Sequence, residues 1–148
     1  MIALDDLTIN NLGLVNVITG ESFSKEQLEE FKESGELAQF AYFKEVPVGV
    51  VVSKPVQPVH SKSPVGLLID VCSVLPAYSS KYDVERQLLS HIEEITKKRH
   101  LDRVYVATEN PAQWEAFGFA VEDHTQELYR GLELVKQGRT LLRKDLSK

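Results

Sequence analysis

Apolar residues recur along the chain with two different spacings, and these separate the predicted helices from the predicted strands. Between residues 83 and 99 they return every three or four positions, as in a helix with one buried face. The residues of this face are Val84, Leu88, Ile92 and Ile95. A second helix is predicted over residues 24–34. Ser24 and Gln27 can form a capping box at its start, and Gly35 can end it.

Short runs of β-branched and aromatic residues predict strands. LAQFAYF (37–43) and VGVVVSK (48–54), separated by a short turn, predict a hairpin. GLLIDVCSVL (66–75) is too continuously apolar for one of its faces to lie in water. VYVAT (104–108) follows the long helix, so this strand and the one before the helix predict a parallel pair.

The remaining segments are interpreted from their strand-forming and strand-breaking residues. LTI (7–9) predicts an opening strand, and PVQPVHSKSP (55–64), with its three prolines, predicts a loop. Residues 110–119 predict a short helix ended by Gly118, and residues 120–135 predict strands and a turn.

The order of these segments predicts the class of fold. Strands and helices surround one parallel pair, so we expect an α+β or α/β domain, with a mixed sheet flanked by about four helices. We expect residues 1–148 to form a single domain, because a chain of this length can bury a core without disulfides or metal. Residues 131–148 are open to two interpretations, a final packed helix or a flexible or partner-bound tail.

Cysteine content, apolar runs and net charge indicate in which compartment and with which kinds of partner the protein is expected. The single cysteine, Cys72, cannot form an internal disulfide, and the opening MIALDDLT has no basic region, so we expect a cytoplasmic protein. No apolar run approaches the roughly 18 residues that cross a bilayer, so no membrane association is expected. The formal net charge of −5 disfavours direct DNA binding. The basic run 97–100 is a solvated helix end or, alternatively, a contact with acidic protein or ribosomal RNA.

Side chains that could carry chemistry are few. The histidines stand apart from any acid or cysteine at ligand spacing, so no metal site is predicted. They are His60, His91, His100 and His124. Cys72 is interpreted as an inert thiol on a buried strand. Tyr78 and Tyr82 could form an acid–base pair, but packing is the favoured interpretation. Trp114 and Phe117 are expected in the core or, where part of them is exposed, as interface candidates.

Five segments in a fixed order carry a resemblance to a known family. They are SGELAQFAYFKEVPVGVVV, LLIDVCSVLPAY, the long helix, DRVYVAT and WEAFGF. In this order the chain resembles the GNAT acetyltransferases, and among them the N-alpha-acetyltransferases of the NatE complex, over residues 7 to 130. The resemblance implies a mixed, mostly antiparallel sheet whose central parallel strands splay apart to hold acetyl-CoA.

The family's pyrophosphate turn, Arg/Gln-x-x-Gly-x-Gly/Ala, belongs at the head of the long helix, where this chain departs from the pattern. Counted from the strand, the three defining positions are Ser79, Tyr82 and Val84. Counted from the helix, they are Ser80, Asp83 and Glu85. No glycine occurs from Leu67 to Phe117, so neither alignment restores the turn. Residues with a Cβ obstruct the backbone's approach to a phosphate, and a carboxylate at about 5 Å costs roughly 3 kcal/mol. We therefore expect no cofactor and regard these six residues as a vestigial turn.

The catalytic pair implied by the resemblance is also replaced. Active relatives have a tyrosine on the strand before the turn and a histidine on the next strand. The matching residues here are Leu68 and Ala107, which cannot accept or relay a proton, so no catalytic residue is expected. The family's Phe-Pro-Val wall for the substrate corresponds here to Thr19-Gly20-Glu21.

Two functions follow from the resemblance. The favoured one is a non-catalytic subunit of the NatA/NatE complex. Its expected partners are the helical-repeat auxiliary subunit, the catalytic subunit of NatA and, through the complex, the ribosome. The alternative is a weakly active N-alpha-acetyltransferase that holds acetyl-CoA through backbone N–H groups of residues 73–75.

Overall fold

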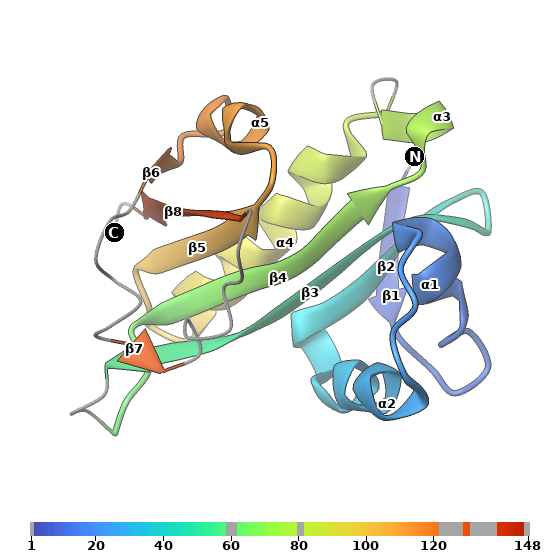
Figure 1. Ribbon diagram of the computed structural model, residues 1–148, viewed down its shortest axis with the longest axis horizontal. Coiled ribbons are helices and arrows are strands. Elements are labelled where there is room, and N and C mark those ends of the chain that lie inside the picture. The colour runs from blue at the N-terminus through green and yellow to red at the C-terminus, as the bar shows by residue number, and fades with distance from the viewer. Residues whose placement is uncertain (1, 59–61, 80–81, 122–128, 131–138, 147–148) are drawn as a thin grey trace. The chain divides into compact units, whose positions relative to one another are not determined.

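The computed structural model describes residues 2–58, 62–79, 82–121, 129–130 and 139–146 (Figure 1). The strands are β1 (Ile2–Asp6), β2 (Ala38–Phe43), β3 (Val46–Pro58), β4 (Gly66–Val74), β5 (Arg103–Thr108), β6 (Ala120–Val121), β7 (Tyr129–Arg130) and β8 (Thr140–Asp145). The helices are α1 (Leu14–Thr19), α2 (Lys25–Glu33), α3 (Pro76–Ser79), α4 (Val84–Lys98) and α5 (Pro111–Glu115), with a 3₁₀ turn at Gly35–Leu37.

The strands form a mixed sheet with the order β1-β2-β3-β4-β5-β8-β6, and β7 pairs with β3. β4 and β5 are parallel, whereas β1–β2, β2–β3, β3–β7, β5–β8 and β6–β8 are antiparallel. This confirms the predicted mixed sheet with one parallel pair. The described residues form five α-helices, one more than expected, because the sequence pattern did not reveal the four-residue α3.

The chain divides into two compact units. The first unit is Met1–Ser53 with Val71–His91, and the second is Lys54–Asp70 with Ile92–Lys148. β3, β4 and α4 each run from one unit into the other. No helix in the described parts of the chain combines the length and the apolar character needed to cross a membrane.

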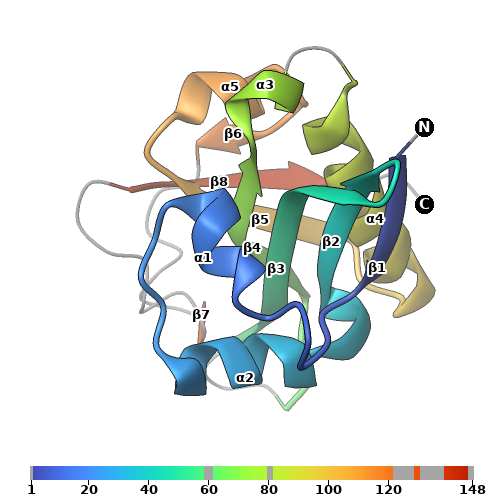
Figure 2. The ribbon, with the colours of Figure 1, turned by 90° about the vertical axis from the view of Figure 1, so that its right-hand side faces the viewer.

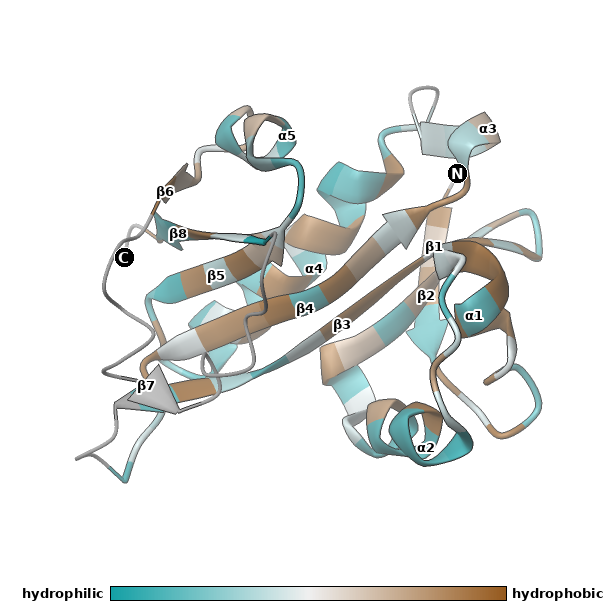
Figure 3. Cartoon of the chain, in the orientation of Figure 1, coloured by the Kyte–Doolittle hydropathy of each residue, from teal (hydrophilic) through white to brown (hydrophobic). Residues whose placement is uncertain are grey.

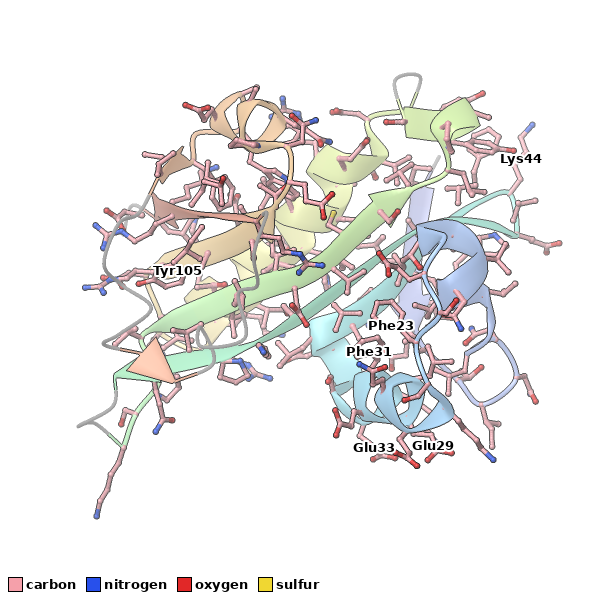
Figure 4. All side chains as sticks on the ribbon, in the orientation of Figure 1. Phe23, Glu29, Phe31, Glu33, Lys44 and Tyr105 are labelled. Atoms are coloured by element: carbon pink, nitrogen blue, oxygen red, sulfur yellow. The ribbon has the colours of Figure 1, made fainter. Side chains whose placement is uncertain are left out.

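In the first unit, α1 and α2 pack beside the antiparallel strands β1 to β3 (Figure 2). The predicted capping box is present, because the Ser24 hydroxyl accepts from the Gln27 N–H and the Gln27 side chain accepts from the Ser24 N–H. Phe23 and Phe31 pack edge to face at 5.1 Å and point toward the sheet, while Glu29 and Glu33 point away (Figure 4). The apolar strands and the polar outer side of α2 stand out in Figure 3. Gly35 has a φ of +60°, as expected of the residue that ends a helix.

The predicted hairpin is confirmed between β2 and β3. Lys44 and Glu45 form its turn with φ values of +50° and +71°, the conformation of a tight turn that matches the twist of the strands. Between Ala41 and Tyr42 of β2 the register shifts, because their partners are Gly49 and Pro47, so the extra residue of this bulge lies in β3.

In the second unit, the parallel register runs from Gly66–Arg103 to Ile69–Val106. A Cβ on Gly66 would lie 2.4 Å from the Arg103 carbonyl oxygen, so only glycine permits this approach of the two strands. β8 pairs with β5 along its whole length, from Arg103–Asp145 to Thr108–Thr140. β5 is therefore held in place by hydrogen-bonded pairing with β4 on one side and with β8 on the other.

The long helix α4 confirms the predicted amphipathic pattern. Val84, Leu88 and Ile92 are fully buried, and Ile95 is almost so. Glu93, which the spacing would pair with Lys97, instead accepts a hydrogen bond from the Lys144 ammonium of β8 at 2.7 Å.

Three predictions about segment ends are wrong. The opening strand is Ile2–Asp6 rather than 7–9, because Leu7 is buried in a turn that leads to α1. The loop predicted over 55–64 begins later, because β3 continues to Pro58, where it pairs with β7 and buries Val56. Within 131–148, the described residues 140–145 form strand β8 and no helix. Its two leucines, Leu141 and Leu142, are adjacent and show no period that separates strand from helix.

Candidate functional site

The turn that would face a cofactor's diphosphate lies in the first unit, after β4 and before α4. Leu75 leaves β4 and donates its N–H to the Val48 carbonyl at 2.8 Å. The Tyr78 N–H then donates to the Leu75 carbonyl at 2.9 Å and closes the short helix α3. Because the Leu75 N–H already has a backbone acceptor, it is not available to an acetyl group.

Val84, the first residue of α4, fills the space behind this turn. Its side chain is 0% exposed. A Cβ placed on Gly49 of β3 would lie 3.1 Å from Val84 Cγ1, 3.2 Å from the Ser73 carbonyl oxygen and 3.3 Å from Val74 Cγ2. The first turn of α4 is thus packed directly on the strands by a β-branched side chain.

Two carboxylates occupy the start of α4. Glu85 accepts a hydrogen bond from the Ser79 hydroxyl at 2.5 Å. Asp83 pairs with Arg86 one helical turn on, at 3.1 Å. Asp83 has a φ of +56°, a conformation that glycine adopts without strain and that aspartate tolerates better than most residues. The helix start is therefore held by its own side chains, and acidic groups there favour the helix dipole.

An aromatic cluster, made of Phe43, Tyr78 and Tyr82, covers the turn on its outer side. The Phe43 and Tyr82 rings lie 4.4 Å apart, and Tyr78 lies 5.9 Å from each of them. The Lys44 ammonium lies 5.4 Å from the centre of the Phe43 ring. Tyr78 and Tyr82 pack against each other, whereas their expected packing over a collapsed cofactor gap stays a prediction. The participation of Phe43 was not predicted, because it comes from the distant β2–β3 turn and no sequence signal links the two segments.

Cys72 of β4 has a thiol with raised pKa. Burial, with a smaller contribution from the charge of Glu85, raises the pKa of the Cys72 thiol from 9.0 to about 12. The thiol is protonated at neutral pH, which agrees with the inert role predicted for it. The residue as a whole is only partly buried, although a core position was expected.

Leu68 and Ala107, the positions of the family's catalytic pair, both lie in the second unit. They are 1% and 8% exposed. They belong to one apolar cluster. Its other members are Val56, Tyr105 and Leu141. Tyr105 is fully buried in this cluster and is labelled in Figure 4. The two aliphatic side chains contribute to a hydrophobic core and offer no group that takes up a proton.

The segment Thr19-Gly20-Glu21 ends α1. The Thr19 hydroxyl donates to the Val15 carbonyl at 2.8 Å and accepts from the Glu21 N–H at 3.1 Å. Gly20 closes the helix with a φ of +73°. All of these contacts cap a helix, and none builds an apolar wall.

The histidines and the remaining aromatic residues lie apart from the turn between β4 and α4 in the sequence. His91 makes a hydrogen bond with the Glu36 carbonyl at 2.9 Å, and His100 lies at the end of α4. Ser80, His60 and His124 lie outside the described residues. In the described residues, no group of three or more His, Cys, Asp and Glu side chains is placed to hold a metal ion. Trp114 is buried and packs with Phe117, which is partly exposed.

These residues fit a nucleotide diphosphate poorly. Binding of phosphate at a helix N-terminus relies on accessible N–H groups and small residues. Here Val84 is buried, the Glu85 and Asp83 carboxylates stand at the helix start, and an aromatic cluster lies alongside. The two carboxylates oppose a dianion on electrostatic grounds, and the packed first turn leaves little freedom for the backbone to approach a phosphate.

Comparison with known proteins identifies the family. No protein-family model matches the chain. It is 32% identical over 113 residues to the uncharacterized N-acetyltransferase C663.13c of Schizosaccharomyces pombe, covering 72% of this chain and 76% of that protein. The structure of this chain is similar to that of Arabidopsis thaliana Naa50 in complex with the bisubstrate analogue CoA-Ac-MVNAL, with a TM-score of 0.73, 18% identity and 97% of each chain covered. It is also similar to the NatB acetyltransferase complex bound to a bisubstrate inhibitor, with a TM-score of 0.73, 12% identity, and 97% of this chain and 90% of that chain covered. The chain therefore belongs to the N-acetyltransferases and has the GNAT fold.

Proposed function

We propose that this chain is a non-catalytic GNAT-fold subunit of the NatA/NatE N-terminal acetyltransferase machinery, related to N-alpha-acetyltransferase 50. The observation that carries the proposal is the filled turn between β4 and α4. Val84 is packed against Gly49, and Glu85 is bound to Ser79, at the positions where relatives would receive the cofactor's diphosphate.

Electrostatics adds to this steric argument. A unit charge about 5 Å from a phosphate costs roughly 3 kcal/mol at an effective dielectric near 20, and solvent reduces the cost for an exposed group. Asp83 is exposed and paired with Arg86, so its contribution is the smaller one. Glu85 is half-buried. An unfavourable contribution of about 3 kcal/mol lowers affinity by a factor of a hundred or more.

The loss of proton-transfer groups supports the same proposal. Deprotonation of a substrate amine needs a side chain or a held water that accepts the proton. Leu68 and Ala107 stand in a dry apolar cluster. Without a tyrosine or histidine at these two positions, the fold would serve a purpose other than catalysis. Binding to a partner protein is the simplest such purpose.

The proposed partners are the helical-repeat auxiliary subunit and the catalytic subunit of NatA, and through them the ribosome. One similar structure is itself an acetyltransferase complex, NatB. A tagged full-length chain, expressed in its own cells, is expected to recover both NatA subunits after a high-salt wash, whereas the tag alone recovers neither. Failure to recover either subunit would refute the docking half of the proposal.

The alternative is a weakly active N-alpha-acetyltransferase, which membership of the N-acetyltransferases favours. The purified chain, mixed with acetyl-CoA and peptides beginning with methionine, distinguishes the two. We expect no acetylation above that of a protein-free control. A rate that increases in proportion to the concentration of the chain would favour the alternative.

A further inference from the structure

A groove lies in the second unit, at the end of α4 and the beginning of β4 and β5. Its volume is about 940 Å³. The turn considered as a cofactor site follows the other end of β4, so the groove is a separate feature of the chain. Four of its lining residues are apolar: Pro64, Val65, Leu101 and Leu146.

Backbone hydrogen bonds fix the walls of the groove. His100 has a φ of +63° and ends α4, with its N–H donating to the Lys97 carbonyl at 3.0 Å. The Leu101 N–H donates to the Thr96 carbonyl at 2.9 Å, which completes a Schellman motif. The Leu146 N–H donates to the Asp102 carbonyl at 2.8 Å. The groove is therefore formed before any partner arrives, and binding does not have to order it.

The rim of the groove carries two cationic side chains, Lys97 and Arg103, beside His100, in a chain whose net charge is −5. Among the described lining residues the acid is Asp102, which pairs with Arg103 at 3.7 Å. Lys98 and Arg99 are exposed in the same turn. Cations at the end of a helix favour its dipole, but that preference does not explain why they surround an apolar floor.

The apolar lining and the cationic side chains of the groove together indicate which kind of partner would fit it. An apolar floor with a cationic rim complements a segment that alternates aliphatic and acidic side chains. A nucleic acid is a poorer match, because no Phe, Tyr or Trp stands among the described lining residues to stack on a base, and Asp102 would face phosphate. We propose that this groove binds an acidic, leucine-containing segment of a partner protein.

The proposal goes beyond the proposed function and does not depend on it. A titration of the full-length chain, labelled with ¹⁵N, tests it. The probe is a short synthetic peptide of Asp and Glu with a leucine at every third or fourth position, added up to about 10 mM in roughly 0.15 M salt. We expect amide shifts at Val65, Leu101 and Leu146 that saturate with a Kd of about 0.1–1 mM, as for a small exposed site.

Two charge variants of the chain and one altered peptide distinguish binding in the groove from non-specific attraction between opposite charges. Lys97→Glu should weaken binding about fivefold or more, whereas Lys98→Glu, with the same charge change beside the groove, should weaken it by less than about twofold. A peptide with serine in place of leucine should bind at least about fivefold more weakly than the parent, because the apolar floor loses its contacts.

Three results would overturn the proposal: no saturable shifts, equal effects of the two lysine variants, or tighter binding of oligouridylate at the same amides. The last would identify the partner as nucleic acid. Co-purification with NatA remains a separate result, so failure of the peptide titration and failure of the proposed function are distinguishable.

Discussion

The packing of Val84 on Gly49 gives the sharpest prediction, because it concerns the residue that fills the candidate turn. We consider Gly49→Ala, Val84→Ala and the double variant. The Cβ added at Gly49 would meet Val84 Cγ1 at 3.1 Å, the Ser73 carbonyl oxygen at 3.2 Å and Val74 Cγ2 at 3.3 Å. All three distances are shorter than ordinary van der Waals contact, and the carbonyl cannot rotate away.

The magnitude follows from these contacts. Overpacking of this kind costs about 1–3 kcal/mol, so we expect Gly49→Ala to lower the free energy of unfolding by roughly 1–2 kcal/mol. Val84→Ala removes two fully buried methyl groups and should cost about 1.5–3 kcal/mol. In the double variant the nearest contact is absent, so Gly49→Ala should cost only about 0.5 kcal/mol. The expected coupling is therefore about 1 kcal/mol, within the range found for residues in contact.

Equilibrium unfolding in urea, checked by thermal melting, measures each of these changes. At this chain length 1 kcal/mol corresponds to a change in Tm of about 2–4 °C. Gly13→Ala is the control, because a Cβ there meets nothing within 4 Å and the φ is −65°. Its effect should stay within about 0.5 kcal/mol. A cost of Gly49→Ala that is the same with valine or alanine at position 84 would refute the packing on which the account of the turn depends.

Three further predictions concern other features of the chain. The pKa of the Cys72 thiol is raised from 9.0 to about 12, so above about pH 9 the folded state keeps a proton that the unfolded state loses. The contribution of this thiol to the free energy of unfolding is therefore complete below about pH 9 and is lost as pH rises toward 12. Denaturant titrations at several pH values should therefore show a steeper loss of stability above about pH 9 for the wild type than for Cys72→Ala, by up to about 1.4 kcal/mol per pH unit, and equal slopes would contradict the shift. His100→Gly should raise the free energy of unfolding by about 0.5–1 kcal/mol, because glycine adopts the positive φ without strain; a loss of stability would argue against that backbone conformation. Lys144→Met should cost about 1–2 kcal/mol by leaving the half-buried Glu93 without this ammonium, and adding Glu93→Gln should recover part of that cost; full additivity in urea unfolding would exclude the pair.

Local sequence signals predicted much of the fold. The capping box at Ser24, the hairpin around Lys44 and the amphipathic face of α4 each lie within one segment, and each is confirmed. The parallel pairing of β4 and β5 followed from the single helix between them. These features depend on neighbours in sequence, which periodicity and capping rules describe.

Features that depend on distant segments were not predicted. The strand Thr140–Asp145 becomes a strand because β5 and β6 offer it partners, and its own residues favour neither state. The extension of β3 to Pro58 depends in the same way on pairing with β7. The aromatic cluster joins Phe43 to Tyr78, which lie far apart in the sequence, so no local pattern could reveal it.

The candidate turn was located by resemblance, and the identity of its residues gave the expectation that it is filled. The sequence indicated that either Val84 or Glu85, depending on the alignment, stands where the family has a small residue, but it could not show where their side chains go. The contact of Val84 with Gly49 and the bond of Glu85 to Ser79 are properties of the folded chain.

The most direct test of the account is a titration of the purified chain with acetyl-CoA, followed by calorimetry and by thermal melting. A ligand at a hundred times its Kd stabilises a protein by about 2.7 kcal/mol, so a cofactor bound at about 10 µM should raise the Tm by roughly 5–10 °C at 1 mM. We predict a change of less than about 1 °C and no saturable heat, because in the proposed function Val84 and the two carboxylates at the start of α4 exclude the diphosphate. A rise of several degrees that saturates with acetyl-CoA would contradict it.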